Sequence, residues 1–242
     1  MCSQIPLTDK QKVFLANGIF RAVTQDISEI IYENDLPTTV GSGLFRWNFI
    51  NRNLSAEMGG DFEFSFQKRG AWKFLILRDR HSKLAFSVMT EQNLKRLQSK
   101  PPLRAHYLEA LVSDNTARDP IEGQMRMPGI YPERDISILA EIKNQLFSEF
   151  SDTVNEHVLV LFDYNYVGVT AVRAVILTTN LEVAVSDDWT KHMTITHIPT
   201  QSILAAALSE EDESLVTLKP EGDTDVSEVV NLPMESSEAE AK

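Results

Sequence analysis

A chain of 242 residues can bury a sizeable core, and its 43% hydrophobic and 24% charged residues are typical of a soluble globular protein. Cys2 is the only cysteine, which excludes an internal disulfide and any paired-cysteine metal or redox motif. No apolar run approaches the roughly 20 residues that span a bilayer, and the N-terminus lacks the pattern of a secretory signal, so we expect a cytoplasmic protein with no membrane partner.

The N-terminal part of the chain predicts a long helix. Residues 8–34 repeat apolar side chains at helical spacing, and either Thr8 or Asp9 can cap the first turn. Pro37 and the threonines beside it end the pattern, because the residue before a proline is disfavoured in a helix.

The next segment, "GSGLFRWNFINRNL" at residues 41–54, fits both common periods. As a helix it buries Leu44, Trp47 and Leu54 and shows a polar row beside them, whereas as a strand it divides aromatic from polar side chains. We favour the helix because a glycine and a serine open the segment.

Three strands are predicted after it. Residues 61–66, "DFEFSF", alternate phenylalanine with polar side chains, which indicates a half-buried strand with its polar face outward. Residues 71–79 and 83–90 are almost continuously hydrophobic, which favours a hairpin of interior strands covered on both faces. Arg80 and His81 lie in its exposed turn.

The second half repeats the order of helices before strands. Residues 114–132 are rich in proline, glycine, aspartate and asparagine, which predicts a long surface loop. Helices are predicted at residues 91–99, 103–112 and 133–150, and strands at residues 157–164, 167–179 and 181–187.

This order predicts an α+β fold, with two groups of mainly antiparallel strands and flanking helices. We expect residues 1–208 to form a single globular α+β domain. Residues 209–242 have low hydrophobicity and high charge, so we expect a disordered acidic tail.

The net charge of −12 is unevenly distributed. The tail holds eleven acidic residues against two lysines, which leaves the body at only −3. Within the body, residues 68–104 hold ten basic residues against Asp79 and Glu91, a local charge of +8. The acidic average therefore argues neither for nor against a polyanionic partner.

Six side chains are the candidates for binding an anionic partner. Three come from the polar row of residues 41–54 and three from the basic stretch: Arg46, Asn48, Arg52, Lys68, Arg69 and Arg80. Guanidinium groups bind phosphate and carboxylate through two parallel hydrogen bonds, although the same groups also hold loop carbonyls within a fold.

Catalytic motifs of the common classes are absent from the sequence, among them the phosphate-binding glycine loops, the zinc-protease helix motif and the nucleophile elbow. A metal-dependent nuclease needs two or three carboxylates around its cations, and Asp61, Glu63 and Asp163 are the candidates for that alternative. No residue pattern indicates a bound metal or a cofactor.

The segments "FRWNFINRNL", "KRGAWKFLILRD", "KLAFSVMTEQNLKRLQ" and "HYLEALV", in this order, resemble an uncharacterised bacterial family, a domain of unknown function. The resemblance covers about residues 10–195, and the acidic tail departs from it. It implies a bacterial cytoplasmic protein and transfers no activity or catalytic residue.

The sequence therefore favours a non-enzymatic interaction or regulatory protein that binds an anionic partner, either a protein or a nucleic acid, through a local basic surface. Two alternatives stay open. One is the metal-dependent nuclease, and the other is a nucleic-acid mimic whose acidic tail binds a basic protein. The sequence leaves the oligomeric state undetermined.

Overall fold

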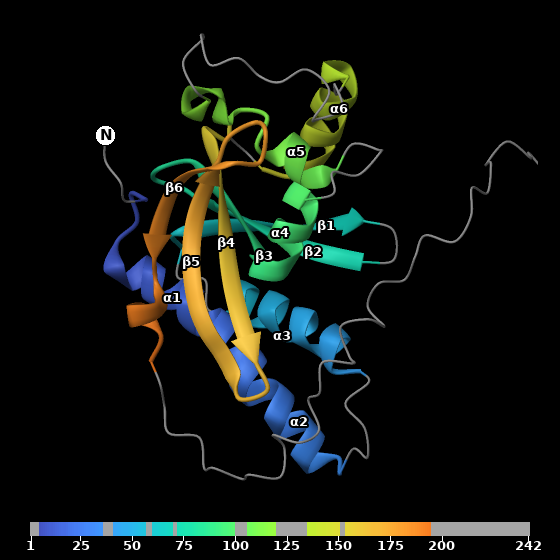
Figure 1. Cartoon of the computed structure of the whole chain (residues 1–242), viewed down its shortest axis with the longest axis vertical. Coiled ribbons are helices and arrows are strands. Elements are labelled where there is room, and N and C mark those ends of the chain that lie inside the picture. The colour runs from blue at the N-terminus through green and yellow to red at the C-terminus, as the bar shows by residue number, and fades with distance from the viewer. Residues whose placement is uncertain are drawn as a thin grey trace, which may run out of the picture.

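The structure, a computed structural model, describes residues 5–35, 41–56, 60–69, 72–99, 106–119, 135–150 and 153–194. Predictions for residues 103–105, for residues 120–134 and for the tail lie outside these ranges. The described strands form one six-stranded sheet in chain order (Figure 1), made of β1 Phe62–Arg69, β2 Trp72–Asp79, β3 Leu84–Thr90, β4 Glu156–Asn165, β5 Gly168–Leu177 and β6 Val183–Asp188.

The sheet consists of two antiparallel groups, β1 to β3 and β4 to β6. They join through one parallel pair, in which β3 from Leu84 to Thr90 runs beside β4 from Glu156 to Phe162. A parallel pair needs a long crossover connection, which the helices between β3 and β4 provide. The predicted α+β class, with two mainly antiparallel strand groups and flanking helices, is confirmed.

Helices of the N-terminal part cover one face of the sheet (Figure 1): α1 Asp9–Phe20, a π-helical segment Arg21–Asp26 and α3 Ser42–Ala56. α2 Ile27–Glu33 continues the long helix and packs against α3. The long helix predicted for residues 8–34 is confirmed. Thr8 forms a capping box with Gln11, because each side chain accepts a hydrogen bond from the other residue's backbone N–H.

α3 confirms the helix predicted for residues 41–54. Ile50 and Leu54 are buried, and Leu54 lies against Gly18 of α1, where a Cβ atom would meet its side chain at 2.6 Å. The predicted burial of Leu44 is wrong, since its side chain is 52% exposed. The cause is that α3 meets α1 near its C-terminal end, and Leu44 lies in the first turn.

The second face carries α4 Glu91–Ser99, α5 Tyr107–Leu111, the 3-10 turn Asn115–Arg118 and α6 Ile136–Phe147. Thr90 caps α4, because its Oγ1 accepts a hydrogen bond from the backbone N–H of Asn93 at 3.2 Å. None of the helices in the described ranges has the length and apolar character needed to cross a bilayer.

The sheet buries apolar side chains on both faces, which makes three layers with the sheet in the middle. Phe62, Leu77 and Phe86 pack toward α1 and α3, together with the fully buried Trp189. The other face packs Ile76 toward α5 and α6 and, further along the sheet, Met89, Leu159, Leu161 and Val175 toward α4 and α5. The hairpin of interior strands, β2 and β3, is confirmed, with Arg80 and His81 exposed in its turn.

The prediction of a surface loop at residues 114–132 is wrong for the first residues of that range. Asn115 is fully buried, and its amide donates to the carbonyl oxygens of His157 and Leu177 at 3.0 and 2.9 Å. Its Oδ1 accepts from the backbone N–H of His157 at 2.9 Å. One asparagine therefore joins the start of β4 to the end of β5, which a sequence rich in turn residues does not reveal.

Candidate functional site

Two arginines predicted to bind an anion are engaged by other side chains of the protein. Arg46 Nη1 donates to Tyr164 Oη at 2.5 Å, and its guanidinium lies 3.9 Å from the centre of that ring. Arg52 Nη2 lies 2.8 Å from Oδ2 of Asp26, a residue only 4% exposed. Asn48, the third member of the row, is exposed on α3. The row is thus divided among three environments.

The basic stretch does not form one surface either. Lys68 lies near the end of β1, opposite the start of β2, whereas Arg80 follows the other end of β2. Arg80 Nε lies 3.8 Å from Glu63, and Arg78 is 1% exposed with its Nη1 3.0 Å from the same carboxylate. Arg69 is the last residue of β1, and its side chain lies outside the described part of the structure.

The carboxylates of the nuclease alternative are far apart. Asp61 and Glu63 lie at the start of β1, and Asp163 lies near the end of β4. Three strand spacings of about 4.8 Å and six residues of about 3.3 Å separate Glu63 from Asp163, a distance of roughly 25 Å. Glu63 is occupied by Arg78 and Arg80. In the described ranges, no group of three histidine, cysteine or acidic side chains is placed to hold a metal ion.

One face of the β1–β2 hairpin brings aromatic and basic side chains together. Phe64 and Phe66 are 44% and 41% exposed, and their rings contact edge to face with centroids 5.7 Å apart. Lys68 continues the same row at two-residue spacing, and Lys73 of β2 lies directly opposite it. These four residues are called the hairpin face below.

The two lysines of the hairpin face are both exposed. Neither takes part in an ion pair within the described part of the chain. Like charges directly opposite each other across two strands destabilise the pair, by roughly 0.2–1 kcal/mol. An anion bound between Lys68 and Lys73 would remove that repulsion.

α3 borders the hairpin face. Asn51 Nδ2 donates to the backbone carbonyl of Lys73 at 3.3 Å, which places this side of α3 beside β2. Asn48 lies one turn earlier on the same side of the helix and is exposed. Of the six predicted binding residues, Asn48 and Lys68 therefore lie at or beside the hairpin face.

The opposite face of β1 is the covered one, which corrects the sequence prediction. Ser65 and Gln67 are 2% and 7% exposed, and Ser65 Oγ donates to Glu149 Oε2 at 2.7 Å just beyond the end of α6. The alternation predicted the reverse, with the phenylalanines inward. Only Phe62 follows that prediction, because its ring packs against the ring of Phe86 with the two centroids 6.0 Å apart.

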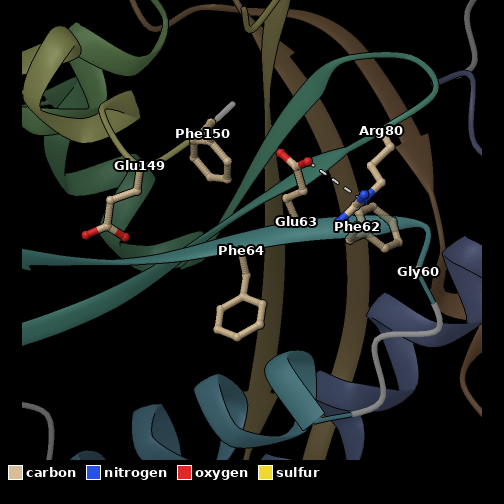
Figure 2. A pocket seen from close by; sticks show the side chains of 7 residues that line it. All are labelled: Gly60, Phe62, Glu63, Phe64, Arg80, Glu149 and Phe150. Carbon is tan, nitrogen blue, oxygen red and sulfur yellow. Dashed lines mark ion pairs between the residues drawn. The ribbon is translucent and has the colours of Figure 1, made fainter. Parts of the chain in front are cut away.

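An open hollow of about 500 Å³ lies beside the start of β1. Figure 2 shows that Phe64 points to the α3 side of the strand while Glu63 points to the other side, near Arg80. Side chains from both faces of one strand therefore border the hollow, which is completed by Gly60, Phe62, Glu149 and Phe150. The hollow accordingly lies along the outer edge of β1.

The hairpin face can stack a planar group on its rings and hold an anion on its lysines. Phe64, Phe66 and Lys73 were missed by the sequence reasoning, since alternation alone does not tell which face of a strand a distant helix covers. The available signal was Lys68, which follows the phenylalanines at the same spacing and predicts a solvated end to that row.

A family model described as a family of unknown function (DUF5986) matches residues 3–228. The match is longer than the resemblance drawn from the sequence, and it includes the acidic segment as far as residue 228. No curated protein and no solved structure matches the chain.

Proposed function

We propose, for a chain that belongs to this family of unknown function, that the protein binds single-stranded nucleic acid without catalysing a reaction. The hairpin face is the contact surface. The proposal places the protein in a reducing cytoplasm, the compartment that a lone cysteine favours.

The observation that carries the proposal is the row Phe64, Phe66 and Lys68 on one exposed face, with Lys73 opposite. Proteins that bind single strands combine aromatic side chains, on which bases stack, with cations that follow the phosphates. Both kinds of side chain occur here at the two-residue spacing of a strand.

A single strand fits this surface better than a duplex. The bases of a duplex are stacked on one another and cannot lie on the ring of Phe64 or Phe66, whereas unpaired bases can. Exposed amides at the rim, such as that of Asn48, suit the edges of unpaired bases.

The charge distribution supports the same ligand. The body carries only −3, so two lysines on a protruding hairpin can attract phosphates locally although the whole chain is acidic. Each lysine that contacts a phosphate of a single strand is expected to add about 0.7 to the slope with which log affinity falls against log salt concentration.

Fluorescence anisotropy with short single-stranded DNA and RNA tests the proposal. Phe66→Ala is expected to weaken binding about 5- to 140-fold, because one base–aromatic stack contributes about 1–3 kcal/mol. Tyr32→Ala is the matched aromatic control, because Tyr32 is 67% exposed on α2. Arg96→Gln on α4, on the other side of the sheet, is the matched control for Lys68→Gln.

Heparin separates stacking from simple charge attraction, because it is a polyanion without bases. We expect Phe66→Ala to leave heparin binding unchanged. Absence of binding to any single strand at low salt, or equal losses for Phe66→Ala and Tyr32→Ala, would overturn the proposal.

A further inference from the structure

The outer edge of β1 is unpaired in the described sheet, because β1 is its first strand. The backbone N–H of Arg80 donates to the carbonyl oxygen of Asp61 at 2.9 Å. Hydrogen-bonded pairs alternate along an antiparallel ladder, and the β1–β2 register has no shift, so odd-numbered residues of β1 face β2. The N–H and C=O groups of Phe62, Phe64, Phe66 and Lys68 therefore point outward.

Within the described residues, this edge has only part of the usual protection against pairing. Edge strands are protected by shortness, bulges, prolines or charged side chains, whereas β1 runs from Phe62 to Arg69 with neither a bulge nor a proline, and its charged side chains lie toward its two ends. The hollow borders this edge over the first half of the strand. Two exposed phenylalanines lie at the middle of the strand, where a pairing strand would bring further apolar contacts.

The two ends of β1 carry charges of opposite sign. Asp61 and Glu63 stand at its N-terminal end, and Lys68 and Arg69 stand at its C-terminal end. An antiparallel partner with the same sequence would set its basic end beside this acidic end. A parallel partner would set like charges side by side.

We propose that two copies of the chain pair antiparallel through β1, with Ser65 of each copy facing the other across a twofold axis. This register pairs the strand along its full length, and it joins the two six-stranded sheets into one continuous sheet. A contact between identical surfaces closes on itself and forms a dimer, in contrast to head-to-tail strand addition, which continues indefinitely.

In this dimer the Phe64 ring of one copy lies beside Phe66 of the other. Side chains stand perpendicular to a sheet, so edge pairing leaves the two hairpin faces open and makes them adjacent. Lys68 of each copy then flanks the combined aromatic row at opposite ends. The dimer does not depend on the nucleic-acid proposal, although it would double the length of the hairpin face.

Glu149 is the contact that opposes pairing. Its carboxylate accepts from Ser65 Oγ, so the carboxylates of both copies would lie near the twofold axis. Glu149 is exposed and can remain hydrated, which limits the repulsion.

Sedimentation of the full chain without nucleic acid is the first test. A dimer of two 27.3 kDa chains is expected to dissociate on dilution. Phe66→Pro removes an outward N–H and should weaken the dimer at least about tenfold more than Phe66→Ala, which keeps that N–H. A monomer at every concentration, or equal effects of the two substitutions, would overturn the proposal.

Cysteine cross-linking is the second test and does not rely on a proline. In a Cys2→Ser background, Ser65→Cys should give a covalent dimer under mild oxidation, because directly opposite residues outside the hydrogen-bonded pairs lie about 4.5 Å apart. Gln67→Cys is the matched control, since in this register residue 67 of one copy lies about 13 Å along the strand from residue 67 of the other copy. Cross-linking of Gln67→Cys alone, or of neither variant, rules out the register.

Discussion

Ser87 Oγ lies 3.0 Å from His157 Nε2 on neighbouring strands β3 and β4. Both residues are almost fully buried, at 2% and 1% exposure, so this serine–histidine pair lies in the interior of the protein. The other ring nitrogen, Nδ1, has no hydrogen-bond partner among the described residues. Burial lowers the pKa of His157 from 6.5 to about 3, so the imidazole is neutral in the folded protein.

Stability should therefore fall as the pH drops. The unfolded chain binds a proton at His157 below pH 6.5, whereas the folded chain does so only near pH 3. Between these values the free energy of unfolding should decrease by about 1.4 kcal/mol per pH unit, and above pH 6.5 this contribution is fully present. Urea denaturation between pH 7 and pH 4.5 measures the slope.

His157→Gln, which cannot titrate, should flatten that slope, and His81→Gln in the exposed β2–β3 turn is the matched control. A slope that His157→Gln leaves unchanged would assign the pH dependence to another group. Asp188 affects stability only at lower pH. Hydrogen bonds from Thr190 lower the pKa of Asp188 from its ordinary 3.8, so its contribution to the free energy of unfolding is lost only as the pH falls below 3.8.

The orientation of β1 can be checked with one substitution at two places on the same face. Phe62 is 5% exposed and Phe64 is 44% exposed. Phe62→Ala should lower the free energy of unfolding by about 3–5 kcal/mol, and Phe64→Ala by less than about 1 kcal/mol. Equal losses in chemical denaturation would show that the whole face is covered.

Glu63 should matter for the stability of the fold. Arg78 is buried and held by Glu63 Oε2 and by the carbonyl oxygen of Thr153. Glu63→Ala removes one of these partners and should cost about 3 kcal/mol, as expected when one partner of a buried charge pair is lost. Asp61→Asn, a change at an exposed carboxylate, should stay within about 0.5 kcal/mol. Thermal unfolding of both variants gives the comparison.

Lys73→Gln should have opposite effects on stability and on binding. Removing one of two like charges facing each other across β1 and β2 should stabilise the fold by roughly 0.2–1 kcal/mol. The same change should weaken single-strand binding and reduce its salt slope by about 0.7. A variant that loses stability as well as binding would show that Lys73 has a structural role.

The acidic segment should compete with the nucleic acid. Residues 209–242 carry a net charge of −9, and their covalent attachment to the body gives them an effective concentration of roughly millimolar order. Deletion of these residues should strengthen single-strand binding and steepen its salt dependence. Filter binding of the full chain and of residues 1–208 at two salt concentrations decides this, and equal affinities would remove the competition.

The elements themselves follow from local sequence. A helix period, a Thr8 cap and a hydrophobic hairpin depend on residues within a few positions of one another, so α1, β2 and β3 could be predicted from the chain alone. The same holds for the α+β class, since the order of strand runs and helix runs decides it.

Only tertiary structure decided which surfaces are free. Which face of β1 is covered depends on where α3 ends and on Glu149, which lies 84 residues from Ser65 and contacts the other face of the strand. Arg46 is engaged by Tyr164 from 118 residues away, so its availability could not be read from its neighbours. Side-chain periodicity defines two faces for every element, and contacts between segments distant in sequence determine which of the two meets solvent.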